Sequence, residues 1–229
     1  MYKLAMLRGT MFCAPIGYSR EFVKKLAGIA DGYAPLLIGG SGMFAMIPTW
    51  RLISPDEREG LVFDGDKIDV VRVVENEVDS AKLKMFGGRC KEVFGKIMEM
   101  LGYVSSRLAF APSVILAENK DKPAVLFNRL YQIRKFHECS LETSNLSQVY
   151  RVTREIQGKE VIVNHVANFH ADSQLIKERG IDRIRERYIC DFDINTMVNP
   201  DNKFAASELN EFFDIVPNWF EEFYNIYFT

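Results

Sequence analysis

The chain has 229 residues, of which 48% are hydrophobic and 26% are charged, and its formal net charge at pH 7 is -2. This length and apolar content exclude a disordered protein and allow one large domain or two small ones. The near-zero net charge excludes attraction of nucleic acid or anionic membrane by the field of the whole molecule, so such binding would need a local basic patch.

The N-terminal stretch and the cysteines indicate the compartment. No apolar run approaches the roughly 20 residues that span a bilayer, and Lys3 and Arg8 interrupt the apolar N-terminus, unlike a signal peptide. The cysteines are Cys13, Cys90, Cys139 and Cys190. They form no C-x-x-C pair, which excludes a zinc knuckle and a thioredoxin motif. We therefore expect a cytoplasmic protein with no membrane partner, whose thiols are reduced and packed in the core.

Residues 1–74 are predicted to form mostly strands. One strand is expected within the first 18 residues, and a short helix follows, capped by Ser19 and ended by Gly32. Asp64-Gly65 is a hairpin signal between the last two strands of this region. The strands expected after the helix are Ala34–Ile38, Met43–Ile53, Gly60–Phe63 and Lys67–Val74.

A long amphipathic helix is expected at Asp79–Leu101, because its apolar residues recur at the spacing of a core-facing stripe. Gly102 ends it, and residues 103–117 are strand-like.

Pro123 begins the next predicted helix, which runs through Phe136. The sequence before it, AENKDKP, is the most polar short connection in the middle of the chain. This connection divides the chain into an N-terminal half, 1–118, and a C-terminal half, 123–229. The halves form either two domains or one continuous domain, and each is expected to contain strands followed by a helix.

The C-terminal half is predicted to contain a hairpin and a further strand. The hairpin joins Gln148–Ile156 to Lys159–Phe169 through Gln157-Gly158. A mixed-charge stretch, Lys177–Arg187, leads to a strand at Tyr188–Asn195, in which buried and solvated residues alternate.

The last predicted helix, Ser207–Tyr227, carries a broad aromatic stripe, and Pro217 is expected to bend or split it. Hairpins joined in sequence, with helices between groups of strands, predict an α+β fold with mainly antiparallel sheet. A long central amphipathic helix and a C-terminal aromatic helix complete the expected fold. The strict alternation of strand and helix in a doubly wound sheet is absent.

The run LLIGGSGMFAMIP, residues 36–48, matches the dinucleotide pattern G-x-G-x-x-[GA]. Nucleotide binding needs a helix that begins at this loop, but Pro48 and the alternating strand after it leave no room for one. We therefore predict a chain reversal at Gly39–Gly42, in which at least one glycine has a positive φ angle. No cofactor is expected.

His170 and Asp172 are the candidate catalytic and metal-ligating residues. In NHVANFHAD, residues 164–172, a strand places these two residues on one face and His165 on the other. A histidine and a carboxylate on one face can hold a divalent metal or orient a general base. No third ligand is visible nearby, so a polar sheet edge is the competing interpretation and neither role is assigned.

Asp191 and Asp193, in the pattern D-x-D-x-N, are the other candidate metal ligands. The pattern lacks the turn glycine and the bidentate glutamate of a calcium loop. It also lies too close to the C-terminal end for the nucleophile strand of a phosphatase. A solvated strand face is the competing interpretation, and Arg185 and Arg187 share this face if the strand begins earlier.

Two further stretches have competing interpretations. His137 and Cys139 could act as base and nucleophile, but closeness in sequence does not bring them within hydrogen-bond reach, and a structural role is favoured. Lys177–Arg187 holds five basic and three acidic residues. Its local charge of +2 favours a solvated surface, with nucleic-acid contact as the minority interpretation.

Trp219, Tyr224 and Phe228 are the candidate interaction residues. They lie outside the apolar stripe of the C-terminal helix, so they give it apolar surface on more than one side. That surface must be buried by another layer of the same chain or by another subunit.

After Pro48 come a strand with Trp50, a long amphipathic helix ending in LGY, a hairpin, and the acidic strand DFDINT before an aromatic helix. In this order of features, residues 48–229 resemble a sporadically distributed family of uncharacterised bacterial and archaeal proteins. Pro48, Trp50, Asp191 and Asp193 match its pattern. The resemblance implies no activity, and the patchy distribution implies a mobile or accessory role, in defence or in a gene-neighbour complex.

These observations favour a non-catalytic binding or assembly protein that acts through protein–protein contacts, as a homo-oligomer or with another protein. One competing hypothesis is a metal-assisted hydrolase that uses His170 and Asp172 with Asp191 and Asp193. The other is nucleic-acid binding through Lys177–Arg187. An enzyme is the less favoured class, and nucleic acid is the less favoured partner.

Overall fold

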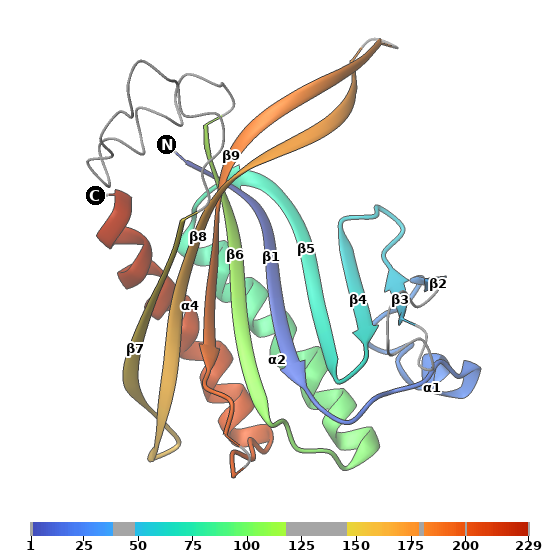
Figure 1. Cartoon of the computed structure of the whole chain (residues 1–229). Helices are drawn as coiled ribbons and strands as arrows, with labels where there is room; N and C mark the ends of the chain where they lie inside the picture. The colour runs from blue at the N-terminus through green and yellow to red at the C-terminus, as the bar shows by residue number, and fades with distance from the viewer. Residues whose placement is uncertain (1, 39–48, 118–145, 179–180, 200, 229) are drawn as a thin grey trace.

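The computed structural model describes residues 2–38, 49–117, 146–178, 181–199 and 201–228, and at 38, 117, 172–178 and 181–186 it describes the backbone only. The nine strands form one antiparallel sheet in the order β2-β3-β4-β5-β1-β6-β9-β8-β7 (Figure 1). The strands are β1 Lys3–Phe12, β2 Ala34–Ile38, β3 Thr49–Ile53, β4 Glu59–Asp64, β5 Lys67–Glu77, β6 Arg107–Ala117, β7 Leu146–Ile156, β8 Lys159–Glu178 and β9 Ile181–Thr196. The predicted α+β class, with its hairpins, is confirmed.

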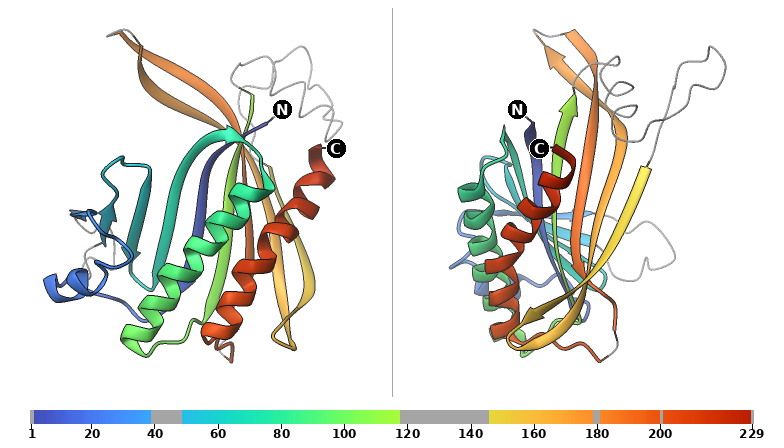
Figure 2. Two further views of the ribbon diagram at one scale, coloured as in Figure 1. Left: turned by 180° about the vertical axis from the view of Figure 1, so that it is seen from behind. Right: turned by 90° about the vertical axis from the view of Figure 1, so that its left-hand side faces the viewer.

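The described helices are α1 Arg20–Lys25, α2 Ser80–Leu101 and α4 Ala206–Phe228. The long helices α2 and α4 lie side by side on one face of the sheet, which we call the inner face (Figure 2). α4 continues through Pro217 as one helix, so the sequence-based expectation of a split at this residue is not met. None of the described helices is long and apolar enough to cross a bilayer.

The core lies between the inner face and these helices. Phe192 of β9 is fully buried there and meets the rings of Phe220 and Phe223 of α4 edge to face. At the other end of the sheet, Phe22 of α1 packs edge to face against the fully buried Trp50 of β3. Edge-to-face contacts between aromatic rings therefore contribute to the core at both ends of the sheet.

The two halves of the sheet have the same order of strands. In the first half β1 pairs with β5, and β4 and β3 follow outward; in the second half β6 pairs with β9, and β8 and β7 follow outward. α2 follows β5 and α4 follows β9 in the chain, and the two helices pack on each other. Because β1 and β6 pair antiparallel at the centre, a pseudo-twofold relation connects the halves within one sheet.

Several predicted boundaries agree closely with the structure. β2 has the predicted bounds, and Gly65 and Gly158 have positive φ angles at the two predicted hairpin turns. Ser19 caps α1 as predicted, but the helix ends at Lys25 rather than at Gly32. Gly28 lies in the stretch after Lys25, and glycine disfavours continued helix because it loses the most backbone freedom on ordering.

Several predictions lie wholly or partly outside the described residues. They are the chain reversal at Gly39–Gly42, the first part of the strand Met43–Ile53, the boundary between the halves at 118–123, the helix from Pro123 to Phe136, and the pair His137 and Cys139.

β8 and β9 are longer than predicted. β7 pairs with β8 only as far as Phe169, and β6 pairs with β9 only as far as Tyr188. Beyond these residues, 172–178 and 181–187 form a two-stranded arm that projects from the sheet (Figure 1). The expectation that the strand begins at Tyr188 is therefore wrong.

Two facing pairs of the arm join residues of opposite charge. The register sets Asp172 against Arg187 and Lys177 against Asp182. Opposite charges on facing residues favour antiparallel pairing. The other facing pairs include both polar and apolar residues, so this stretch lacks the strict alternation from which strands are predicted.

Candidate functional site

The face of the sheet opposite α2 and α4, the outer face, carries a polar cluster on three adjacent strands. The Ser113 hydroxyl of β6 donates a hydrogen bond to Asp191 Oδ1 of β9 over 2.5 Å. The His170 ring of β8 contacts the other carboxylate oxygen, with Nε2 2.7 Å from Oδ2. Asp191 therefore links its two neighbouring strands through one side chain.

The strand registers explain this meeting. Ser113 and Asn168 face Asp191 directly across β6 and β8. His170 faces Ile189, so its ring reaches Asp191 on the diagonal, which is within range for a long side chain. His165 is an odd number of residues away and lies on the inner face, as the alternation predicts.

The order of these contacts decides what the cluster can do. In a nucleophilic triad, histidine must accept the hydroxyl proton and the carboxylate must orient the histidine. Here Ser113 donates to Asp191 rather than to His170, and the second ring nitrogen, Nδ1, lies 3.3 Å from the Ala171 carbonyl oxygen. The carboxylate thus joins the strands, and no serine–histidine pair is formed.

Asp193 lies two residues further along β9 on the same outer face. Burial raises the pKa of its carboxyl, although a hydrogen bond from Asn195 and the charges of Arg107 and Arg8 act in the opposite direction. Its Oδ1 atom is buried and has no hydrogen-bond partner in the part of the chain that the structure describes. A raised pKa weighs against this carboxyl as a cation ligand, because ligation requires the charged form.

The structure brings together some of the residues considered for a metal site. His170 and Asp191 are in contact, and Asp193 follows on the same strand. Asp172 lies in the arm, where the backbone register sets it against Arg187. Among the described residues, no group of three histidine, cysteine or acidic side chains is placed to hold a metal ion.

An open hollow of about 460 Å³ lies beside this cluster. It is formed by the facing ends of β7 and β8 and includes Ser147, Asn168 and His170. The side chain of His170 is 33% exposed, so one edge of the ring can be reached from the hollow. A polar molecule in the hollow would meet a hydroxyl, an amide and an imidazole.

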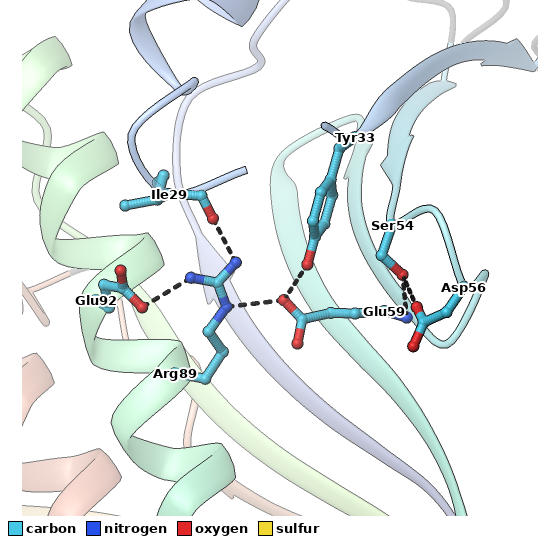
Figure 3. Close-up of polar contacts among 7 residues, drawn as sticks. All are labelled: Ile29, Tyr33, Ser54, Asp56, Glu59, Arg89 and Glu92. Carbon is cyan, nitrogen blue, oxygen red and sulfur yellow. Dashed lines mark hydrogen bonds and ion pairs between the residues drawn. The ribbon is translucent and has the colours of Figure 1, made fainter. Parts of the chain in front are cut away.

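A second polar cluster lies on the inner side and is centred on Arg89 of α2 (Figure 3). Arg89 Nε donates to Glu59 Oε1 of β4 over 2.7 Å, and Nη1 donates to Glu92 Oε2 over 2.7 Å. Nη2 donates to the Ile29 carbonyl, and the Tyr33 hydroxyl donates to Glu59 Oε1 over 2.7 Å. One guanidinium thus ties α2 to β4 and to the segment after α1.

This second cluster is closed to ligands. The side chains of Arg89 and Glu59 are only 18% and 11% exposed, and each is engaged with protein groups. Burial and the Glu59 carboxylate raise the pKa of the Tyr33 hydroxyl. We interpret the cluster as a structural clamp.

Sequence reasoning did not single out Arg89 or Glu59. A usable signal was present, because Arg89 directly precedes Cys90 on the core-facing stripe of the helix. A charged residue at the border of such a stripe needs a partner when it is buried. Its partner Glu59 could not be identified from sequence, since 30 residues separate them.

His165 is buried on the inner face, where its ring meets Phe223 of α4 edge to face. Burial lowers the pKa of His165 to about 4, and the nearby positive charge of Arg154 acts in the same direction. The imidazole is therefore neutral at pH 7. It serves as a core residue rather than as a ligand or base.

The three described cysteines are free thiols in buried positions, as predicted. Burial raises the pKa of Cys13 to about 11, and it also raises the pKa values of Cys90 and Cys190. A thiol with a raised pKa is a poor nucleophile. Cys139 lies outside the described residues.

The three aromatic residues considered for partner contact pack within the chain. Trp219 is 7% exposed, and the guanidinium carbon of Arg154 lies 5.2 Å from the centre of its ring. Tyr224 contacts Phe192, and Phe228 contacts both Phe192 and Tyr2. Tyr224 and Phe228 remain partly exposed. Their contact with a partner stays a prediction.

The basic stretch Lys177–Arg187 falls on the arm. By register, Arg183, Arg185 and Arg187 share the face of β9 that carries Asp191. Nucleic-acid-binding ribbons carry basic residues on one face, and the arm has three arginines in such positions. The acidic residues of the arm and the chain's net charge of -2 oppose it.

A search of protein-family models and a search of curated protein sequences both find no match to this chain.

Proposed function

We propose that this chain is a non-catalytic binding or assembly protein that acts through protein–protein contacts. The observation that carries the proposal is the edge of the sheet at β7. β7 pairs with β8 on one side, and among the strands that the structure describes it is the last of the sheet. Its apolar residues Val149, Tyr150 and Val152 are 55%, 45% and 37% exposed.

A long edge strand with exposed apolar side chains is a ready surface for another protein. Its outward N–H and C=O groups can bond to an added strand, and proteins that avoid such contacts usually shorten or bulge their edge strands. β7 has 11 paired residues without a shift in its register. β7 therefore has neither a bulge nor a proline that would block strand addition, and its exposed charges Arg151 and Glu155 restrict which strand can be added.

The polar clusters support the same proposal by exclusion. Ser113 and His170 are both held by Asp191, and Arg89 is held by Glu59. Because these side chains join strands and helices, they stabilise the sheet and the helices packed on it, which we call the platform. A platform with an open edge strand suits a role in binding or assembly.

Sedimentation velocity over a wide range of concentrations tests this proposal. We expect a species heavier than the 26.3 kDa chain, whose fraction grows with concentration. In Val149→Lys, association should weaken at least tenfold, because a charge then lies on the contact strand. Met85→Lys is the matched control, since Met85 is 64% exposed on α2 and far from β7 in the fold.

A wild-type chain that stays monomeric at every concentration contradicts assembly. Equal weakening by Val149→Lys and Met85→Lys contradicts the role of the β7 edge.

The second candidate is the metal-assisted hydrolase expected at His170 and Asp172 with Asp191 and Asp193, of which the contact between His170 and Asp191 is the supported part, while the raised pKa of Asp193 and the place of Asp172 in the arm count against these two as ligands. It is favoured by one observation, the 2.7 Å contact between His170 Nε2 and Asp191 Oδ2 beside the open hollow. A metal would replace the proton shared between these two side chains and activate a water in the hollow.

Metal analysis of protein purified without chelator tests this candidate. Stoichiometric metal, together with a rise in Tm on addition of Mn²⁺ or Zn²⁺ that Asp191→Asn abolishes, would support it. Absence of bound metal and of any shift in Tm would remove it. Asp214→Asn, an exposed carboxylate on α4, is the matched control.

A further inference from the structure

The pseudo-twofold relation of the sheet identifies the kind of segment that fits beside β7. β7 corresponds to β3, and β3 carries β2 as an antiparallel strand on its outer side. Among the described strands, none occupies the corresponding place beside β7. The fold therefore already accepts one more antiparallel strand at this position in its other half.

The hairpin turn determines which backbone groups of β7 face the open edge. β7 and β8 are joined by a two-residue turn, Gln157-Gly158, in which both residues have positive φ angles. Such a turn makes Ile156 and Lys159 a hydrogen-bonded pair. Because these pairs alternate along an antiparallel ladder, odd-numbered residues of β7 present their N–H and C=O groups to the open edge.

Self-pairing of β7 is limited to a few registers. Two copies that meet antiparallel around a twofold axis bond through odd-numbered residues of both strands. Arg151 and Glu155 are odd-numbered, exposed and on the same face. A register centred on Arg151 would bring two arginines opposite each other, which is unfavourable.

The register centred on Thr153 gives complementary contacts. It sets Arg151 opposite Glu155 of the second copy, and the twofold axis repeats this pair. It also sets the partly exposed Val152 opposite the aliphatic part of Arg154 of the second copy. This register therefore matches the charges, and it sets an exposed apolar side chain beside a long one.

We propose that the chain forms a twofold dimer in which β7 pairs antiparallel with β7 of a second copy, centred on Thr153. The dimer joins two nine-stranded sheets edge to edge. This inference rests on the proposed function, because it names the partner that occupies the same edge.

Charge reversal on the full chain tests the register. In Arg151→Glu, two like-charged glutamate pairs replace the two opposite-charge pairs, and in Glu155→Arg two arginine pairs do so. Each variant alone should dimerise with a Kd at least tenfold above that of the wild type. An equimolar mixture of the two variants restores both opposite-charge pairs, so it should form a heterodimer with a Kd within about threefold of the wild type.

Sedimentation equilibrium measures these constants, and a tag of different mass on one variant distinguishes the heterodimer. Lys84→Glu on α2 makes the same change of charge at an exposed site away from β7, and its Kd should equal that of the wild type. Far-UV circular dichroism and thermal unfolding confirm that each variant is folded.

Three outcomes would overturn the inference. A dimer that tolerates both charge reversals shows a different interface, and it leaves the proposed function standing. Species that grow beyond the dimer indicate head-to-tail contact between β7 and another edge. A wild-type chain that is always monomeric overturns the dimer and contradicts the proposed function as well.

Discussion

At the scale of single residues, His165 gives the chain a pH-dependent stability. Its pKa is about 4 in the folded chain, lowered by burial and by the charge of Arg154, against an ordinary value of 6.5. The unfolded chain therefore binds a proton at a higher pH than the folded chain does. This contribution is constant above pH 6.5 and is lost as the pH falls from 6.5 towards 4.

We expect the free energy of unfolding to fall by about 1 kcal/mol between pH 7.5 and 5.5 through His165 alone. Urea denaturation of the wild type and of His165→Leu at both values measures this, because the variant lacks the group and should lose less stability over the interval. The two proteins should show equal changes between pH 8.5 and 7.5. If the free energy of unfolding changed equally with pH in the wild type and in His165→Leu over the whole range, a neutral buried His165 would be contradicted.

At the scale of elements, the contact between α2 and α4 depends on a glycine and a proline. Pro217 has no N–H, so the carbonyl of Phe213, one turn earlier in α4, lacks its helical donor. That carbonyl oxygen points at Gly87 of α2, so closely that a Cβ atom there would collide with it. Gly87 therefore permits the close approach of the two helices at the turn of α4 that contains Phe213 and Pro217.

Gly87→Ala should lower the free energy of unfolding by about 1 to 3 kcal/mol, because the added methyl group pushes the helices apart. Gly88→Ala is the matched control. Its Cβ would meet nothing within 4 Å, so stability should be unchanged or should rise by up to about 1 kcal/mol through helix propensity. Chemical denaturation measures both, and equal effects of the two substitutions would refute the close approach at Gly87.

The clamp at Arg89 also acts between elements. Arg89→Ala leaves the mostly buried Glu59 carboxylate without its cation, and it should cost about 3 kcal/mol of stability. Glu92→Ala removes an ion pair whose carboxylate is 53% exposed, and it should cost less than about 1 kcal/mol. Thermal and urea unfolding of the two variants compare these effects, and a small cost for Arg89→Ala would mean that the clamp is dispensable.

At the scale of the whole molecule, the arm is separate from the platform. Neither β6 nor β7 pairs with residues 172–187, so within the described sheet these residues pair only with each other. Replacing this segment by a two-residue turn between Ala171 and Tyr188 should preserve cooperative unfolding and change Tm by less than about 4 °C. Calorimetry checks this, and loss of the cooperative transition would show that the arm stabilises the sheet.

Much of the fold could be predicted from the sequence, because most helices and strands have a recognisable local pattern of residues. The alternation from Tyr188 to Asn195, the cap at Ser19 and the helix end at Gly102 reflect contacts within a few residues. The arm was not predicted in this way, because residues 172–178 and 181–187 do not alternate strictly between polar and apolar.

The candidate site was predicted in part. Alternation on one strand places His170 and His165 on opposite faces, and the structure agrees. The contact of His170 with Asp191 required the register between β8 and β9, which no local pattern contains. Ser113 was missed altogether, because a single serine in an apolar strand carries no signal until its neighbour across the sheet is known.

The sequence by itself therefore determined the α+β class, the caps and turns, and the face on which most of the discussed side chains lie, because these depend on neighbours along the chain. The tertiary structure alone decided that both halves share one sheet with a pseudo-twofold relation, that Asp191 joins Ser113 and His170, and that β7 is the outermost of the described strands at its end of the sheet. These features depend on pairing between strands far apart in sequence. Such pairing follows from the packing of the whole core rather than from any local pattern.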